Sequence, residues 1–404
     1  MDTVRASTPS EAIGVHVPSG RIPLSVPELR GNEWAYLKEC LDTGWVSSAG
    51  PFVERFERAV QQWIGPTYPV AVVNGTGGLH LAMRAMRVQP EDEVLVPSLT
   101  FIAPVNAIRY CGAHPVFVDA DPATWQMDVR QAAAFLEREC EVRGTRPGDV
   151  ECWHKERHRR VRAILPVHVL GLSCAMDEIN ILAKRYHLRI IEDAAEAIGV
   201  RHGPLHAGAW GHIGVLSFNG NKTMTCGGGG MVLASAKVHQ TYVRYLSTQA
   251  KDDPKEYYHR EVGYNYRMTN LQAAVGLAQL EQLPAFLERK RAIARRYREA
   301  FTDLPKITPM PQQEGAAYWL YTILTPGREQ RDSLVAALEE DGIEARPLWR
   351  PIHTLPPYEG CHSAGPLETA VNLYERAVSL PSSVGLSEAD LARCAAVVTQ
   401  SLQA

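Results

Sequence analysis

The chain has 404 residues and a net charge of −3, with 42 lysines and arginines against 45 aspartates and glutamates. This near balance excludes a protein built to coat nucleic acid or an anionic membrane. No run approaches the roughly 20 apolar residues that span a bilayer, and the N-terminus has no basic start followed by an apolar stretch. We therefore expect a soluble cytoplasmic protein of two or three domains, whose eight cysteines are free thiols.

The first part of the chain has little hydrophobic periodicity. Residues 1–20 carry Ser, Thr, Pro and Gly and predict a loose N-terminal arm. Two helices are predicted next, the first over 32–41. The second covers 52–64 and follows Pro51, which stands where a first helical residue would.

Short apolar runs then alternate with amphipathic stretches. The predicted strands cover 70–73, 93–96, 115–118, 161–167, 189–191, 214–218 and 230–233, and the predicted helices cover 78–88, 104–111, 129–139 and 176–187. Strands separated by helices indicate an α/β fold. We expect a mainly parallel, seven-stranded sheet with helices on both faces.

The pattern changes toward the C-terminus. The predicted elements there are a long helix over 270–301, a strand over 318–324, a helix over 331–341, a strand over 343–346 and a last helix over 388–402. This order is typical of a smaller α+β domain. We therefore divide the chain into the arm, a large domain over 21–280, and a linking helix with a small domain over 281–404.

One polar segment, residues 141–162, separates a predicted helix from its following strand. Cys152, His154 and His158 lie in it and are candidate metal ligands. Their spacing matches no standard zinc pattern, and a fourth ligand is not evident. We therefore interpret the segment as a solvated surface hairpin and predict no metal site.

In an open parallel sheet, ligands bind at the carboxyl ends of the strands. The segment 74–78 follows one predicted strand with small residues and opens a helix, so its N–H groups could hold an anion. An ordinary turn would give the same pattern. Phe101 follows another strand and could lie over the same crevice, although core packing is the simpler explanation for one aromatic residue.

Two further segments carry ionisable groups. In 190–196 a carboxylate ends a buried strand, where it needs a cation or strong donors unless it caps the next helix. In 217–223, Lys222 stands among small residues and can act as a nucleophile. A phosphate-binding P-loop is excluded, because Asn221 stands where that motif requires Gly.

Together these segments supply an anion cradle, an aromatic ring, a buried carboxylate and a lysine. Pyridoxal phosphate needs this set, because its phosphate favours a helix N-terminus and its ring nitrogen needs a carboxylate to stay protonated. Its face favours an aromatic ring, and its aldehyde reacts with a lysine amine. The sequence therefore predicts pyridoxal phosphate as the cofactor.

Longer motifs resemble a known family. EDAAEAIG at 192–199, SFNGNKTMTCGGGGM at 217–231 and GYNYRMTNLQAA at 263–274, with TGWVSSAGPFV at 43–53, are similar to signatures of the DegT/DnrJ/EryC1/StrS sugar aminotransferases. The resemblance runs from about residue 22 to the C-terminus. It implies a fold-type-I pyridoxal-phosphate enzyme that acts on nucleotide-linked keto sugars.

The resemblance also implies roles for individual residues. By this resemblance, Lys222 forms the internal aldimine with the cofactor and Asp193 pairs with its pyridinium nitrogen. The cofactor phosphate is held by Thr76, the Gly77 backbone and Ser217. Phe101 stacks on the cofactor ring, Glu196 lies beside its 3-hydroxyl, and Asn265 reaches the cofactor phosphate of the partner subunit. The last role implies a homodimer with shared active sites.

Within the family, Glu196, the sequence at 219–221, the glycine run at 227–230 and the segment 141–162 look like the subgroup similar to LegC and PglE. That subgroup implies transfer of an amine from glutamate to C4 of a UDP- or GDP-linked 4-keto-6-deoxy sugar, commonly an acetamido sugar, for surface-glycan or amino-sugar biosynthesis. The alternatives are a perosamine-type activity on the unacetylated GDP sugar and amination at C3.

The sugar nucleotide is expected to contact Trp45 and Ser47 in the N-terminal part, and Tyr318 and Arg346 in the small domain. Two other functions are disfavoured. Dehydratases of this family have His in place of the lysine, whereas Lys222 is present. A regulator without turnover is disfavoured because no DNA-binding module precedes the sheet and the charge is balanced.

Overall fold

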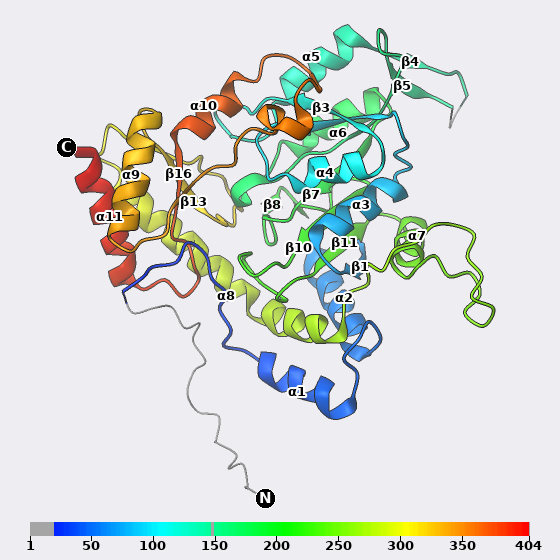
Figure 1. Cartoon of the computed structure of the whole chain (residues 1–404), viewed down its shortest axis with the longest axis horizontal. Helices are drawn as coiled ribbons and strands as arrows, with labels where there is room; N and C mark the ends of the chain where they lie inside the picture. Colours follow the sequence, from blue (N-terminus) through cyan, green and yellow to red (C-terminus); the bar gives the residue numbers. More distant parts are fainter. Residues whose placement is uncertain (1–19, 147–148, 404) are drawn as a thin grey trace, which may run out of the picture.

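The computed structural model describes residues 20–146 and 149–403, so the arm expected over 1–20 lies outside it except for Gly20. Figure 1 shows a large domain around a central sheet and a small domain that carries the C-terminus. Within the described residues, no helix is both long enough and apolar enough to cross a membrane. All eight cysteine thiols are free.

The central sheet contains all seven strands that the sequence predicts. They are β1 (Tyr68–Val72), β2 (Glu93–Pro97), β3 (His114–Val118), β6 (Arg160–Ile164), β7 (Arg189–Asp193), β10 (Ile213–Ser217) and β11 (Gly230–Ala234). Their order across the sheet is β1-β11-β10-β7-β6-β2-β3. Only β11 runs antiparallel to its neighbours among these seven. A mainly parallel sheet is therefore confirmed.

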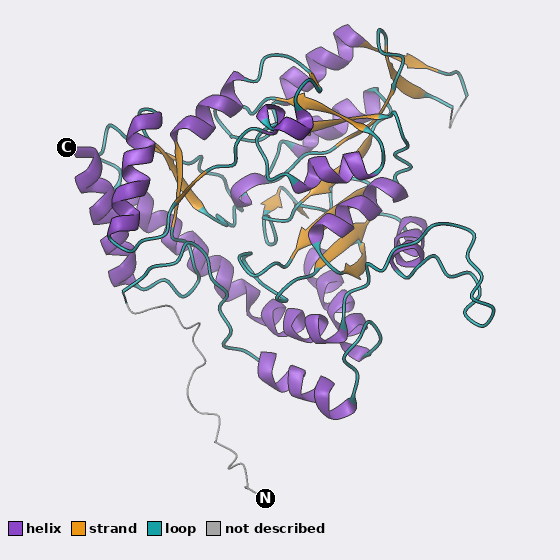
Figure 2. Ribbon diagram, in the orientation of Figure 1, coloured by secondary structure: helices purple, strands orange, loops and turns teal. Residues whose placement is uncertain are grey.

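Helices cover both faces of this sheet, as Figure 2 shows. The side chains of Val94 and Val96 pack on one face, and that of Leu95 packs on the other, as the alternation of a strand requires. On the first face lie α3 (Gly75–Ala85), α4 (Ala103–Tyr110) and α7 (Lys237–Ser247), and on the second lie α2 (Pro51–Ile64), α5 (Val129–Glu139), α6 (Met176–Arg185) and the first half of α8 (Asn270–Ala300). Because both faces are buried, the strands are nearly continuous apolar runs.

Three further strands extend the sheet. β4 (Cys140–Arg143) and β5 (Glu151–His154) form an antiparallel hairpin within the segment 141–162 and its flank, and β5 pairs with β6. The hairpin expected there is present, but Cys152 and His154 are buried in it. β15 (His362–Ser363) adds a parallel strand beside β3.

The boundary expected at 280/281 does not coincide with a break in the structure. It falls inside α8, a single 31-residue helix that starts at a capping box of Thr269 and Gln272. The first half of α8 packs in the large domain and its second half packs in the small domain, where Ile22 and Leu24 also pack. The segment 352–364 returns to the large domain. Its side chains pack in two of the hydrophobic cores there, and its strand β15 pairs with β3. The two domains are therefore joined by several crossings of the chain.

The small domain is built on an antiparallel sheet in the order β12-β13-β16-β14. Its elements are β12 (Thr308–Pro309), β13 (Tyr321–Leu324), α9 (Arg328–Glu340), β14 (Arg346–Pro347), α10 (Glu368–Arg376), β16 (Ala377–Leu380) and α11 (Glu388–Gln403). The predicted strand 318–324 starts late, because Tyr318 has a left-handed φ of 47°. The predicted strand 343–346 is also displaced, since Ile343 bridges to Ile22 and β14 starts only at Arg346.

The remaining elements are small. They are α1 (Glu33–Thr43), which packs on α8, the short hairpin of β8 (Arg201–His202) and β9 (Leu205–His206), and the single turns η1 (Val169–Gly171), η2 (Ile352–Thr354) and η3 (Pro356–Tyr358). Helices α7 and α10 and strand β16 are not among the elements predicted from the sequence.

Lys290 lies where α8 enters the small domain. It is 2% exposed, and its Nζ donates to the carbonyl oxygens of Trp319 at 2.9 Å and Ser382 at 2.5 Å. Burial lowers the pKa of this amine to about 7. The amine thus holds two segments of the small domain, one of which carries Trp319, in place against α8.

This buried amine predicts a pH dependence of stability. The native pKa of Lys290 is about 7, whereas an unfolded lysine titrates near 10.4. Between these values the unfolded chain binds more protons, so the free energy of unfolding rises with pH by up to about 1.4 kcal/mol per unit. Below pH 7 both states are protonated and this contribution is flat. In Lys290→Met the rise should be absent.

The measurement is denaturant unfolding of the wild type and Lys290→Met at several pH values from 6 to 9. The wild type should gain stability relative to the variant as the pH rises above 7. Lys306→Met, which changes an exposed lysine, serves as the control and should follow the wild type. Parallel curves for the wild type and Lys290→Met would contradict the assignment.

Candidate active site

Three of the predicted segments meet at the carboxyl ends of neighbouring strands. Asp193 ends β7 and pairs with Val215 of β10, which itself ends two residues later at Ser217. The first turn of α3 lies against this point, since a Cβ on Gly75 would come within 2.9 Å of the Ser217 Cβ. The missing side chain at Gly75 thus permits the close approach of helix and strand.

Lys222 lies at the same edge of the sheet, on the loop that follows β10. Its Nζ lies 3.3 Å from Glu196 Oε1 and 4.0 Å from the centre of the Trp319 ring. The indole N–H of Trp319 donates to the carbonyl oxygen of Asn221 at 2.7 Å, so the ring is fixed to the lysine loop. The amine is therefore held between a carboxylate and an aromatic face.

Glu196 is 6% exposed, and its second oxygen accepts the Leu170 N–H at 2.8 Å. Burial raises the pKa of Glu196, and the positive charge of Lys222 opposes that rise. Leu170 is held in a left-handed turn at φ 61°, and its carbonyl oxygen accepts the backbone N–H of Trp319 at 3.0 Å. The turn at η1 thus connects Glu196 to the small-domain residue that covers Lys222.

Asp193 is 4% exposed. Its Oδ1 accepts the Ala195 N–H at 3.0 Å, the one hydrogen bond that the carboxylate makes within the described residues. Burial raises the pKa of Asp193, whereas the Ala195 N–H and the charges of Lys222 and His168 lower it. A buried carboxylate with unused acceptor capacity is suited to a cationic N–H donor.

Glu192 precedes Asp193 and has a different role. It is fully buried, and it accepts the backbone N–H groups of Gly208, Trp210 and Gly211 at 2.6 to 2.8 Å. His168 Nε2 lies 3.0 Å from it, and His168 Nδ1 accepts the Cys174 N–H, so Nε2 carries the proton. Glu192 thus fixes the loop around 208–211 and the turn beside Asp193. No local pattern singles out His168 in the sequence.

The proposed phosphate ligands lie around the start of α3. The Thr76 and Ser217 hydroxyls are partly exposed and make no hydrogen bond within the described residues. The Gly77 N–H, however, donates to Asn74 Oδ1 at 2.7 Å as part of a helix cap. The Asn74 side chain would therefore have to give up this N–H for the Gly77 backbone to bind phosphate, whereas the Thr76 and Ser217 hydroxyls are free to do so. All three roles stay predictions.

These residues fit pyridoxal phosphate. A buried carboxylate, a lysine amine and two free hydroxyls at a helix N-terminus lie along one edge of the sheet, and each matches one group of the cofactor. Phe101, 55% exposed, follows β2 on the same edge. Asn265 is exposed beside Tyr266, whose carbonyl oxygen accepts the Val73 N–H near the end of β1.

The expected substrate residues are dispersed. The carbonyl oxygens of Trp45 and Ser47 accept from the side chain and backbone of Asn270 at 2.8 and 2.6 Å, so their loop is fixed to the start of α8, with Trp45 50% exposed. Arg346 forms a surface ion pair with Glu344 at 2.6 Å.

Tyr318 does not lie beside Lys222. Its hydroxyl contacts Gln313, and its side chain lines a separate hollow next to Arg291 and Arg298. The next residue, Trp319, covers the lysine instead. The left-handed φ of Tyr318 changes the direction of the chain before β13, so these two neighbouring side chains point to different places. The expected contact of Tyr318 with the sugar nucleotide stays a prediction.

The hairpin segment contributes a polar cluster away from this site. His154, His362 and Glu139 place ligand atoms within 4.8 Å of one another. Nδ1 of His154 accepts the Arg157 N–H, and Nδ1 of His362 faces the Arg157 guanidinium at 3.2 Å. A metal-bound imidazole normally donates through its other nitrogen. Both rings here face donors at that nitrogen, which favours a hydrogen-bonded cluster.

The chain is similar to sugar aminotransferases over nearly its whole length. A model of the DegT/DnrJ/EryC1/StrS aminotransferase family matches residues 27–399. A GDP-perosamine synthase from Escherichia coli O157:H7 is 40% identical over 366 residues, 91% of this chain and 94% of that protein. Another from Caulobacter vibrioides is 38% identical over 388 residues, 95% of this chain and 98% of that protein. The crystal structure of a DegT DnrJ EryC1 StrS aminotransferase from Brucella abortus matches with a TM-score of 0.83 at 30% identity, over 92% of this chain and 96% of that one.

Proposed function

This chain belongs to the DegT/DnrJ/EryC1/StrS family of pyridoxal-phosphate-dependent aminotransferases, and we propose that it transfers the amino group of glutamate to C4 of an unacetylated, GDP-linked 4-keto-6-deoxy sugar. Relatives named GDP-perosamine synthase, which match nearly the whole chain, support this substrate. The acetamido sugar expected from the sequence has no such support. The alternative weighed there, a perosamine-type activity, becomes the main proposal.

The observation that carries the proposal is the position of Lys222 between Glu196 and Trp319, on the same edge of the sheet as Asp193. Pyridoxal phosphate, when bound, supplies an aldehyde for amines and a ring that takes up electrons. In our proposal Lys222 moves the proton that transamination transfers from the amino donor. Its closest acceptor, Glu196 Oε1, holds the amine in position.

Asp193 has a separate role in this proposal. Its buried carboxylate holds a proton on the ring nitrogen of the cofactor, which a neutral side chain in the same place would do poorly. Thr76 and Ser217 bind the phosphate. The indole of Trp319 covers the lysine amine and limits the access of water to it.

We further propose that two copies of the chain form a homodimer with shared active sites. Large apolar side chains are exposed on α1 and the loop after it. These are Trp34, Leu41, Trp45 and Val46, which are 64%, 62%, 50% and 41% exposed. Several large apolar side chains exposed on one helix and the loop after it are typical of a surface that a partner covers. A second copy that covers this surface would bring its own exposed loops, such as that of Asn265, to the site.

The experiment is a substrate panel with purified enzyme, pyridoxal phosphate and glutamate. The acceptors are the unacetylated GDP-linked 4-keto-6-deoxy sugar, a UDP-linked 2-acetamido analogue and a TDP-linked analogue. We expect kcat/KM for the GDP sugar to exceed the others by about 100-fold or more, because mismatched polar groups are strongly rejected by a fitted site. Release of 2-oxoglutarate and the product mass report turnover.

NMR of the product distinguishes amination at C4 from amination at C3. Lys222→Ala serves as the blank for every acceptor. A preference for the acetamido sugar would replace this proposal with the expectation drawn from the sequence. Failure of every acceptor to produce 2-oxoglutarate would refute sugar transamination altogether.

A further inference from the structure

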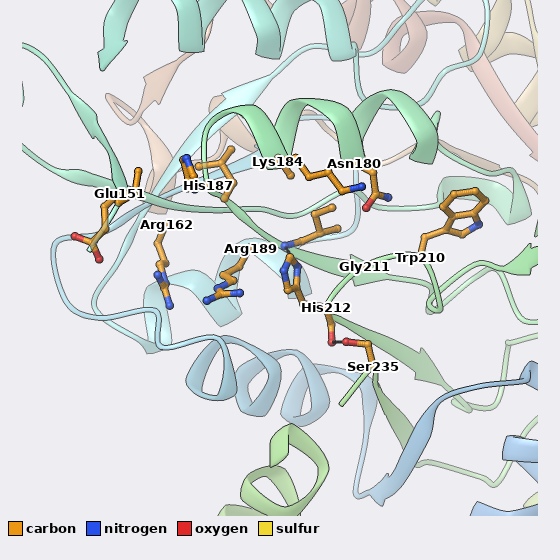
Figure 3. A pocket seen from close by; sticks show the side chains of 14 residues that line it. Glu151, Arg162, Asn180, Lys184, His187, Arg189, Trp210, Gly211, His212 and Ser235 are labelled. Carbon is orange, nitrogen blue, oxygen red and sulfur yellow. Dashed lines mark hydrogen bonds between the residues drawn. The ribbon is translucent and has the colours of Figure 1, made fainter. Parts of the chain in front are cut away.

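A second pocket lies at the opposite edge of the sheet, where the parallel strands begin (Figure 3). Its volume is about 540 Å³, and residues at the starts of β6, β7 and β10 line it together with the end of α6. β7 starts in this pocket at Arg189 and ends at Asp193 in the candidate active site. At roughly 3.3 Å per residue, the two sites lie more than about 10 Å apart. The pocket is therefore distinct from the catalytic edge.

Three cations face this pocket without an acidic partner. Arg162, Lys184 and Arg189 line it, and within the described residues none of them has a carboxylate oxygen within 4.0 Å. Arg162 donates its Nε to the carbonyl oxygen of Met86 at 2.9 Å, and its terminal nitrogens make no hydrogen bond to any part of the chain that the structure describes. Figure 3 shows Arg162 and Arg189 reaching into the same space.

Among the described residues, Glu151 is the one carboxylate that lines the pocket, and it is already engaged. Glu151 accepts from Arg160 at 2.7 Å, and Arg160 is also paired with Asp92 at 2.7 Å. The neighbouring arginine on the same strand is thus neutralised, whereas Arg162 is not. The side chains of Arg162, Lys184 and Arg189, unpaired within the described part of the chain, therefore give the pocket an excess of positive charge.

This excess affects the groups inside. Burial, and then the charges of Arg160 and Arg189, lower the pKa of Arg162 to about 10. Burial, and then Arg189, His239 and Arg162, lower the pKa of His212 to about 4. An anion placed between the arginines would relieve this repulsion and form charge-assisted hydrogen bonds.

The other end of the pocket offers an aromatic wall. Trp210 lines it, and within the described residues its buried indole N–H has no acceptor. The Trp210 backbone is fixed by its bond to Glu192 at 2.8 Å. A second hollow of about 750 Å³ shares Arg162 and Arg189 and adds Arg87. Cations and an aromatic face in one pocket suit a phosphorylated ligand with a planar base.

We propose that this pocket binds a diphosphate group, with a nucleoside diphosphate as the ligand class that fits both of its ends. Arg162 and Arg189 hold the phosphates, and Trp210 contacts the base. The proposal does not rest on the substrate of the catalytic site, because the residues involved are at the other edge of the sheet.

The test is calorimetric titration of the full-length holoenzyme with pyrophosphate, GDP and guanosine. Pyrophosphate should bind the wild type, and Arg162→Gln or Arg189→Gln should each weaken that binding about tenfold or more, as the loss of a charge-assisted hydrogen bond predicts. GDP should quench the fluorescence of Trp210, a signal that Trp210→Phe lacks. Guanosine alone should bind weakly.

Arg185→Gln is the matched control. Arg185 lies next to Lys184 but is 65% exposed and does not line the pocket, so this variant makes the same charge change nearby. It should keep the wild-type affinity for pyrophosphate. All variants should retain transamination, which verifies that they fold. Absence of pyrophosphate binding, equal affinity in Arg189→Gln, or an equal loss in Arg185→Gln would each overturn the proposal.

Discussion

Lys222→Ala and Lys222→Arg should both lose transamination, with kcat at least about 10⁴-fold below the wild type. The alanine variant lacks the amine that lies 3.3 Å from Glu196. The arginine variant keeps a positive charge between Glu196 and Trp319, so the ion pair and the contact with the indole can persist. A guanidinium stays protonated at any ordinary pH and cannot accept the proton that must move.

Comparing these two variants distinguishes a role of Lys222 as a positive charge from a role in proton transfer. If the lysine acted only as a structural cation, Lys222→Arg would retain much of the activity and Lys222→Ala would not. Equal and nearly complete losses support a chemical role. The measurements are glutamate-dependent release of 2-oxoglutarate and borohydride fixation of pyridoxal phosphate to the protein, which should occur in the wild type only. Fixation in either variant would contradict the assignment of Lys222.

The parts of the fold that sequence could predict are those with a local cause. β2 is buried along its whole length, and after Glu93 it is a continuous apolar run, as expected for a strand covered on both faces. The sequence does not predict α7, because its residues, KVHQTYVRYLS, include many β-branched and aromatic side chains that favour strands. β15 has two residues and is a strand only through its pairing with β3.

The residues of the candidate site also divide into those with a local signal in the sequence and those placed by distant contacts. Asp193 and Lys222 could be proposed from the sequence because Asp193 ends one strand of a parallel sheet and Lys222 follows another, where ligands bind. Trp319 could not, because its position over Lys222 depends on a turn at Leu170 that is 149 residues away along the chain and on the left-handed Tyr318 before it. Such contacts are set by the packing of two domains and leave no mark on hydrophobic periodicity.

Asp193→Asn should lower kcat by about 100-fold or more, although the variant differs from the wild type by one atom type. An amide at this position can still accept the Ala195 N–H that Asp193 Oδ1 accepts at 3.0 Å. It cannot carry the charge that holds a proton on the ring nitrogen of the cofactor. Asp193→Glu keeps the charge at a shifted position and should lose less than Asp193→Ala, which removes both functions.

The asparagine variant also distinguishes catalysis from folding. Burial raises the pKa of Asp193, so its charge is unfavourable in the protein without cofactor. Asp193→Asn should therefore melt at the same temperature as the wild type or higher when pyridoxal phosphate is removed, and should gain less from added cofactor. If Asp193 only capped the turn at Ala195, the asparagine variant would be fully active, and only the alanine variant would fail. Kinetics and thermal melting of the three variants, with and without cofactor, decide between these roles.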